Sequence, residues 1–346
     1  MTQRKTLHLT RRNAMIGSAA VIAMPWIARA QVALPKVRFT AGWSFQGNQS
    51  YMLRAQKAGY FRDAGVDVSV SRGFGSGRIP VDIAGGVFDL GAGEMSATLK
   101  FMAENPDSDL VVVAILEDTN QVAMTVRADG PIKTPKDIEG ASLAAPESDV
   151  GRQLFPAYAK VAGIDASKVT WISVAPELRE PMLIQKRTAG VTGNASSTAP
   201  SLKRLGMDLP DQRIFFYRDA GLDLYSNCYV ASRKFAEKNP AALKAALTGL
   251  FRAYVDYYRD ATDSLKVLAE VEPLTDLKIE TERVAFLKKI MPMGKAMKEQ
   301  GISTVDPARL ELCITTIEEA YGLPKRLTKE RVYTDAYLPA QSQRMV

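Results

Sequence analysis

Polar side chains that could contact a small molecule stand where short β-rich runs end. The run at 37–41 is followed by Trp43, and the amides of Gln46 and Gln49 come soon after. A flat indole beside several amides suits an aromatic or heteroaromatic solute, through stacking and hydrogen bonds. Ligands of α/β proteins bind at the carboxyl ends of strands, so these positions are candidates. A tryptophan packed under a polar loop is the alternative, and the sequence does not separate the two.

A glycine-rich segment, Gly73-Phe74-Gly75-Ser76-Gly77, offers a second place for a ligand. Glycines let backbone N–H groups approach a ligand, and the helix predicted over 77–85 would present its N-terminus there, so Gly75 and Ser76 are candidates. A plain tight turn is the alternative. The segment lacks the Lys-Ser/Thr of a P-loop and the full dinucleotide spacing, so it does not indicate nucleotide binding.

Acidic and amide side chains follow other predicted strands. Glu94 follows the strand at 89–93 and either accepts hydrogen bonds from a ring or amine nitrogen or compensates a helix dipole. Asn194 follows the strand at 189–193 and opens a further helix rich in donors. Asp118 follows a buried strand and is either a ligand contact or a solvated loop residue.

Two more pairs complete the candidates. Ser148 and Asp149 open a helix predicted over 149–162, where Ser148 is interpreted first as the N-cap and free amides beside it could bind an oxygen of a solute. Asp223 and Tyr225 stand where the chain is predicted to cross between two lobes. Both side chains either face the cleft between the two lobes, from the side of this crossing, or are solvated loop residues.

The composition excludes several kinds of chemistry. The one histidine is His8, so a chain that starts after residue 30 has no imidazole for catalysis or for binding zinc or haem. Two cysteines, Cys228 and Cys313, are too few for a zinc cluster or a disulfide scaffold, and they either form one bridge or stay buried. We therefore expect no catalytic residue, no metal and no cofactor.

The net charge of +7 comes mostly from the first 30 residues, which hold five basic residues and no acidic one. The rest keeps 40 of the 45 basic residues against 38 acidic ones, which does not indicate a nucleic-acid partner. Arg11-Arg12 precedes an apolar run at 14–23 and the small residues around Arg29, which resembles a twin-arginine signal peptide over 1–30. A basic tail beside a short membrane anchor is the alternative, but the run is shorter than the ~20 residues of a span. We expect a soluble periplasmic protein that begins near Gln31.

From residue 36 onward, short β-rich runs alternate with helical patterns, which predicts βαβ units and a largely parallel sheet. The pattern starts again with an extended run at 122–126, and we predict a second α/β lobe at 129–222, inserted into a first lobe at 36–128 and 223–346. The crossings near 127–130 and 220–226 would form a hinge. Asn239-Pro240 predicts the start of a helix with an N-cap side chain. Its apolar stripe, which includes Tyr254, is interpreted as core.

Several segments, in this order, resemble periplasmic solute-binding proteins of the nitrate, taurine, alkanesulfonate and thiamine-precursor type. They are Gly59-Tyr60-Phe61 with Gly65-Val66-Asp67-Val68, the glycine-rich segment, Gly85-Gly86-Val87-Phe88-Asp89-Leu90-Gly91, Thr134-Pro135-Lys136-Asp137 and Gly221-Leu222-Asp223-Leu224-Tyr225. The resemblance implies a two-lobed, type II periplasmic-binding fold, and Met95 stands beside Glu94, where relatives place ligand contacts. Where many relatives carry Gly-x-Val-Asp-Ala, this chain reads Gly190-Val191-Thr192-Gly193. That acidic contact therefore cannot be carried over.

The resemblance also implies a function. We expect a monomer that binds a small molecule by closure of its lobes and is then recognised by ABC permease subunits in the inner membrane. Acidic candidates around amides and Trp43 indicate a neutral or nitrogen-bearing solute, because a sulfonate or nitrate would call for more cations than Arg152. Two alternatives stay open: an enzyme of the same fold that acts on a pyrimidine or aromatic sulfur compound, and a ligand-sensing partner of a membrane receptor.

Overall fold

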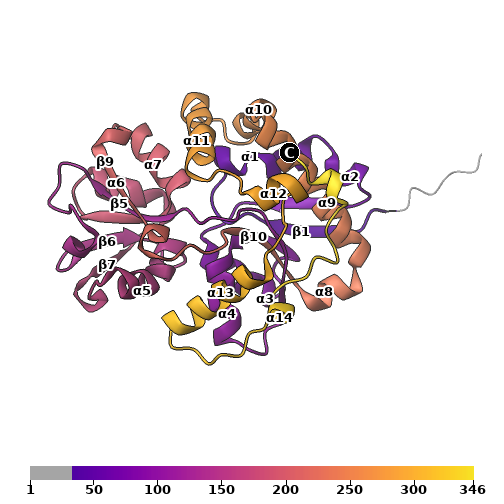
Figure 1. Ribbon diagram of the computed structural model, residues 1–346. Coiled ribbons are helices and arrows are strands. Elements are labelled where there is room, and N and C mark those ends of the chain that lie inside the picture. Colours follow the sequence, from indigo (N-terminus) through magenta and orange to yellow (C-terminus); the bar gives the residue numbers. More distant parts are fainter. Residues whose placement is uncertain (1–32) are drawn as a thin grey trace, which may run out of the picture. The chain divides into compact units, whose positions relative to one another are not determined.

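The computed structural model describes residues 33–346, and the predicted signal peptide over 1–30 lies outside them. These residues fold around two five-stranded sheets (Figure 1). The first has the strand order β2-β1-β3-β10-β4, with β1 Lys36–Thr40, β2 Asp67–Ser71, β3 Leu90–Glu94, β4 Leu110–Ile115 and β10 Asn227–Ser232. The second has the order β7-β6-β8-β5-β9, with β5 Val122–Arg127, β6 Ser142–Ala145, β7 Thr170–Ser173, β8 Gly190–Asn194 and β9 Gln212–Phe216. The predicted α/β class is confirmed.

Both sheets follow one plan. In each, one strand (β10 or β5) runs antiparallel to both of its neighbours, and the other pairs are parallel. Every residue of β4 is buried, as expected of a strand covered on both faces. The carboxyl ends of the parallel strands of each sheet therefore share one edge, where the loops that follow them meet.

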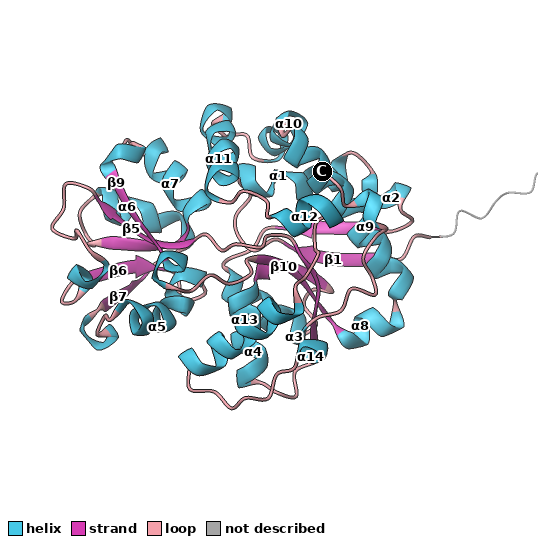
Figure 2. Ribbon diagram, in the orientation of Figure 1, coloured by secondary structure: helices cyan, strands magenta, loops and turns pink. Residues whose placement is uncertain are grey.

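Helices cover the faces of both sheets (Figure 2). They are α1 Ser50–Lys57, α2 Tyr60–Asp63, α3 Ile79–Ala84, α4 Met95–Glu104, α5 Val150–Ala162, α6 Arg179–Ile184, α7 Ala195–Arg204, α8 Arg233–Lys238, α9 Pro240–Arg259, α10 Thr262–Val271, α11 Leu277–Ile290, α12 Lys295–Gln300, α13 Pro307–Ala320 and α14 Lys329–Val332. We call the first sheet with α1–α4 and α8–α14 the first lobe, and the second sheet with α5–α7 the second lobe. Within residues 33–346, no helix has both the length and the apolar character that a bilayer crossing needs.

Two helix caps differ from the sequence-based expectation. The N-cap of α5 is Asp149, whose carboxylate accepts a hydrogen bond from the backbone N–H of Arg152 at 3.0 Å. Ser148, which was predicted as the cap, points its hydroxyl elsewhere. Pro240 occupies the first position of α9 as predicted, but the Asn239 side chain donates back to the carbonyl of Phe235 and does not cap α9.

The chain crosses between the lobes earlier than predicted. β5 lies inside the range 36–128 that the sequence assigned to the first lobe, but it pairs with β8 and β9 in the second sheet. The first crossing is therefore 116–121 rather than 127–130, and the second covers 217–226. A backbone hydrogen bond joins the two crossings, from Ser226 N to the carbonyl of Glu117 at 3.0 Å. A buried apolar strand carries no sign of the sheet that it joins, which is why the boundary was misplaced.

Candidate functional site

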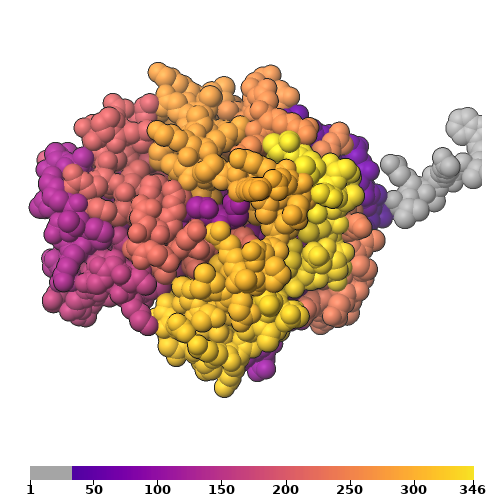
Figure 3. Space-filling view, in the orientation of Figure 1, coloured from indigo at the N-terminus to yellow at the C-terminus, as the bar shows by residue number. Residues whose placement is uncertain are grey.

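A cavity lies between the two lobes, and we call it the interlobe cavity. The surface of the protein is hollowed between the orange and yellow C-terminal segments and the second lobe (Figure 3). The first lobe and the crossings contribute Gly42, Trp43, Asn48, Gln49, Tyr51, Met52, Ser76, Ala92, Leu116, Glu117, Gln121, Asn227, Tyr254 and Leu287. The second lobe contributes Asp149, Val150, Arg179, Asn194 and Ser197. The space that the centre of a water molecule could occupy is about 40 Å³, which is room for a few waters.

The cavity lining includes the buried arginine Arg179, and its charge is already matched. Arg179, at the start of α6, is 2% exposed, and its guanidinium carbon lies 4.6 Å from the centre of the Trp43 ring. Its Nη1 donates to Asp149 at 2.9 Å, and its Nη2 donates to Glu180 at 2.6 Å. Two carboxylates thus neutralise Arg179, and one face of the Trp43 indole is covered by it.

Two glutamates lie in or beside the cavity. Glu94, which is 1% exposed, lies just behind the lining and accepts hydrogen bonds from Asn194 Nδ2 at 2.7 Å and Ser226 Oγ at 3.0 Å. Burial raises its pKa to about 8, and the charge of Glu117 adds to that rise. Glu117 lines the cavity and accepts a hydrogen bond from Asn227 Nδ2 at 2.6 Å. Burial raises the pKa of Glu117 to about 7.

Three amides of the lining present oxygens that have no partner. Asn48 Oδ1, Gln49 Oε1 and Asn194 Oδ1 are buried, and none accepts a hydrogen bond within residues 33–346. The amide nitrogen of Asn194 faces the Glu94 carboxylate, so its oxygen is turned away from Glu94. The amide nitrogen of Asn48 donates to Ser196 Oγ at 3.2 Å. The lining is therefore rich in hydrogen-bond acceptors.

The glycine-rich segment contacts the second lobe directly. Ser148 Oγ donates to the carbonyl of Phe74 at 2.6 Å, and Gly77 N donates to the carbonyl of Ser148 at 3.0 Å. Gly75 has φ +126°, and a Cβ atom there would lie 2.4 Å from the Ser148 carbonyl oxygen. A side chain at this position is excluded both by the backbone conformation and by the neighbouring lobe.

Gly75→Ala is expected to separate the glycine-rich segment from Ser148 and to lower the free energy of unfolding by about 1–3 kcal/mol. Its radius of gyration in small-angle X-ray scattering should exceed that of the wild type purified in the same way. Ser148→Ala is the control, because it loses one hydrogen bond without a clash and should keep the wild-type radius. Equal radii for Gly75→Ala and the wild type would contradict this expectation.

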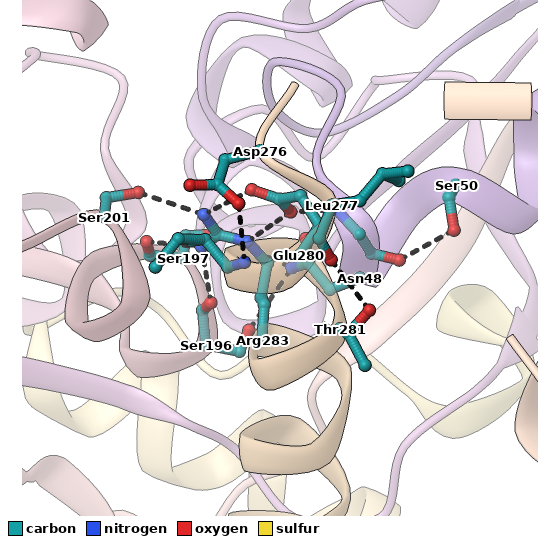
Figure 4. A network of polar contacts seen from close by, with 12 residues as sticks. Asn48, Ser50, Ser196, Ser197, Ser201, Asp276, Leu277, Glu280, Thr281 and Arg283 are labelled. Atoms are coloured by element: carbon teal, nitrogen blue, oxygen red, sulfur yellow. Dashed lines mark hydrogen bonds and ion pairs between the residues drawn. The ribbon is translucent and has the colours of Figure 1, made fainter. Parts of the chain in front are cut away.

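A second polar network, made by α11, also joins the lobes (Figure 4). Arg283 is 1% exposed and donates to the backbone carbonyls of Ser196 and Ser197 in α7, at 2.8 and 2.7 Å. It also forms an ion pair with Glu280 at 2.7 Å. Glu280 in turn accepts the backbone N–H of Gly47 at 2.5 Å. One buried pair on α11 thus contacts both the loop before α1 and the start of α7.

The structure places the predicted site residues in three groups. Trp43, Gln49, Ser76, Asp149 and Asn194 line the cavity. Four others are near it without lining it: Glu94, Met95, Gly75 and Ser148. Four lie elsewhere: Gln46 in a groove beside Glu177, Asp118 against Gly294, Asp223 in an ion pair with Arg309 at 3.1 Å, and Tyr225 bonded through its hydroxyl to Asp306 N.

Sequence reasoning missed other lining residues. Asn48 stands between the two predicted glutamines, and Glu117 directly precedes Asp118, so the strand-end rule came within one residue of each. Tyr254 was interpreted as core; it is buried and also lines the cavity. Nothing in the sequence signals Arg179, because its role comes from the way α6 packs against Trp43.

Solved structures with the same architecture include periplasmic binding proteins. The alkanesulfonate-binding protein SsuA from Xanthomonas axonopodis pv. citri, bound to MOPS, has a TM-score of 0.66 at 16% identity, over 88% of this chain and 99% of that one. The aliphatic sulphonate binding protein SsuA from Escherichia coli has 0.63 at 18%, over 91% and 92%. The nitrate-binding protein NrtA from Synechocystis PCC 6803 has 0.54 at 12%, over 71% and 69%. These likenesses confirm the predicted periplasmic-binding fold.

Sequence comparison defines the family. No curated protein sequence matches the chain. The family model described as NMT1/THI5 like matches residues 46–262, which is more than half of the chain and contains most of the cavity lining. The sequence analysis found short segments that occur in the same order as in this group of solute-binding proteins, and that resemblance is confirmed. The chain belongs to the NMT1/THI5-like family.

Proposed function

We propose that this protein is the solute-binding component of an ABC importer and captures a small nitrogen-containing or aromatic solute in the interlobe cavity. The observation that carries the proposal is that both lobes line one small cavity at strand ends. Clefts of this kind are the usual ligand sites of open α/β sheets. The family and the fold support a binding role of this type.

The charges of the cavity favour a nitrogen-bearing solute over an oxyanion. The solved relatives are named as binding an alkanesulfonate, an aliphatic sulphonate or nitrate. In this chain, Arg179 is committed to Asp149 and Glu180, so it offers no unbalanced positive charge to an anion. Glu117 faces the cavity with acceptor amides around it, which favours a ligand that donates hydrogen bonds.

Closure of the lobes is the proposed mechanism, with the crossings 116–121 and 217–226 as the hinge. The contacts between the lobes include the hydrogen bond from Asn194 to Glu94 and the bonds from Arg283 to α7, and these break as the lobes separate. A solute held by both lobes binds the closed arrangement better than an open one, and so shifts the population toward it. We propose that permease subunits recognise the closed arrangement.

The proposal includes export to the periplasm, on the strength of the twin-arginine pattern at 11–12 and the family. In the proposed function, neither cysteine thiol reacts with the solute. Cys228 and Cys313 are free and buried, and burial raises the pKa of the Cys313 thiol, which disfavours the nucleophilic thiolate. This supports a binding protein over a cysteine-dependent enzyme of the same fold.

Titration calorimetry with amines, pyrimidines, aromatic acids and sulfonates tests the proposal. We expect an amine or a pyrimidine to bind one to one, and Gln49→Leu to weaken that binding at least tenfold. Gln46→Leu is the matched control, because Gln46 lies outside the interlobe cavity, and it should stay within threefold of the wild type. Tight binding of sulfonates or nitrate alone, or of nothing in the panel, would refute the proposal.

A further inference from the structure

The lining of the interlobe cavity carries several hydrogen-bond acceptors, and its arginine, Arg179, is already paired with two carboxylates. Asn48, Gln49 and Asn194 of the lining each carry a buried amide oxygen without a partner among residues 33–346, and Glu117 adds a carboxylate. Buried acceptors without a donor cost free energy, so native proteins rarely keep several of them together. Their concentration in one lining is explained if a bound molecule supplies the donors.

The arrangement of the lining fixes which acceptors stay available. Asn194 is oriented by Glu94, and Asn48 by Ser196, because in each case the amide nitrogen is already donating. In this arrangement neither oxygen has a donor among residues 33–346. Asn48 and Gln49 come from the turn before α1, whereas Asn194 comes from the end of β8. A ligand that donates to all three therefore contacts both lobes.

We propose that the cavity selects a compact cation with several N–H donors, an amidinium or guanidinium group, whose charge faces Glu117 and whose N–H groups donate to Asn48, Gln49 and Asn194. This inference rests on the proposed function and specifies the solute class. A planar cation of this kind offers donors in several directions and no acceptor, which complements a lining of oxygens. An oxyanion would instead place its charge beside Glu117, with Arg179 already neutralised.

Three probes of the same size and different charge test this inference. Benzamidine is a cationic amidinium, benzamide is neutral, and benzoate is an anion. Calorimetry on the wild-type protein should show benzamidine binding at least tenfold more tightly than benzamide, with benzoate the weakest. Benzamide or benzoate binding as tightly as benzamidine would overturn the inference.

Glu117→Gln separates the charge from the shape of the site. The amide keeps the size of the side chain and can still accept the hydrogen bond from Asn227, so the fold should be retained. We expect benzamidine to lose at least tenfold in affinity while benzamide changes less than threefold. Glu147→Gln is the matched control, because Glu147 lies in a separate groove and should leave both affinities unchanged. Equal losses for both probes would count against a role for the charge.

The outcomes distinguish this inference from the proposed function. If a neutral pyrimidine or an aromatic acid binds tightly and Gln49→Leu weakens it, the binding function stands and the cation inference fails. If no solute of any charge binds, the proposed function itself fails. Selective binding of benzamidine that depends on Glu117 supports both.

Discussion

Arg283→Met is expected to lower the free energy of unfolding by about 3–5 kcal/mol, because it removes one partner of a buried ion pair and leaves the other. Glu280 would be left without its partner in a site where the arginine is 1% exposed and the glutamate 8%. Two α7 carbonyls would lose their donors as well. Urea denaturation followed by circular dichroism measures the loss as a lower transition midpoint.

Arg252→Met is the matched control for this expectation. Arg252 also forms an ion pair, at 3.0 Å with Asp63, but the two side chains are 53% and 62% exposed. Exposed pairs contribute less than about 1 kcal/mol, so this variant should stay near the wild type. Arg283→Lys should recover only part of the loss, because a single ammonium cannot reach two carbonyls and a carboxylate in the same fixed geometry. Similar midpoints for Arg283→Met and Arg252→Met would show that α11 does not tie the lobes.

The α11 network also bears on the interlobe cavity. Leu287 of α11 and Ser197 of α7 both line the cavity. Arg283, one turn before Leu287, donates to the carbonyl of Ser197. A solute that closes the lobes would favour the arrangement in which Arg283 reaches α7, and that arrangement would in turn favour the solute. Residues distant in the sequence, near 47, 197 and 283, thereby act on one site.

Local patterns in the sequence were enough for most elements. The helix predicted over 149–162 is α5, which begins one residue later and ends as predicted, because Gly163 follows it in the left-handed conformation, φ +67°. Packing decided what local patterns could not. The apolar run of β5 fits either sheet equally well, and only its pairing with β8 and β9 places it in the second.

The lining of the interlobe cavity, our candidate site, was predicted only in part, for a similar reason. The strand-end rule depends on topology, so it placed Trp43, Gln49 and Asn194 in the lining. It failed between Glu117 and Asp118, because β4 is buried throughout and has no alternation to show which of the two next side chains turns inward. Two predicted residues lie outside the lining because they bind the start of α13: Asp223 pairs with Arg309, and Tyr225 accepts from Asp306 N. The sequence does not reveal where α13 packs.

The wild-type protein is expected to lose stability relative to Glu94→Gln as the pH rises from 5 to 8. In the unfolded chain Glu94 ionises near its ordinary pKa of 4.5, whereas in the fold burial and the charge of Glu117 raise the pKa to about 8. Between these values the fold holds a proton that the unfolded chain has released, so a rising pH favours unfolding. The difference should grow by about 1.4 kcal/mol per pH unit and level off above pH 8.

Urea denaturation at pH 5, 6, 7 and 8 measures this difference. Glu319→Gln is the control, because Lys325 lowers the pKa of that exposed carboxyl, so it is already ionised over the whole range and its difference from the wild type should stay flat. In a Glu117→Gln background the Glu94 difference should level off at a lower pH, since that variant removes the charge that adds to the raised pKa of Glu94. If Glu94→Gln ran parallel to the wild type from pH 5 to 8, Glu94 would have to be ionised in the fold.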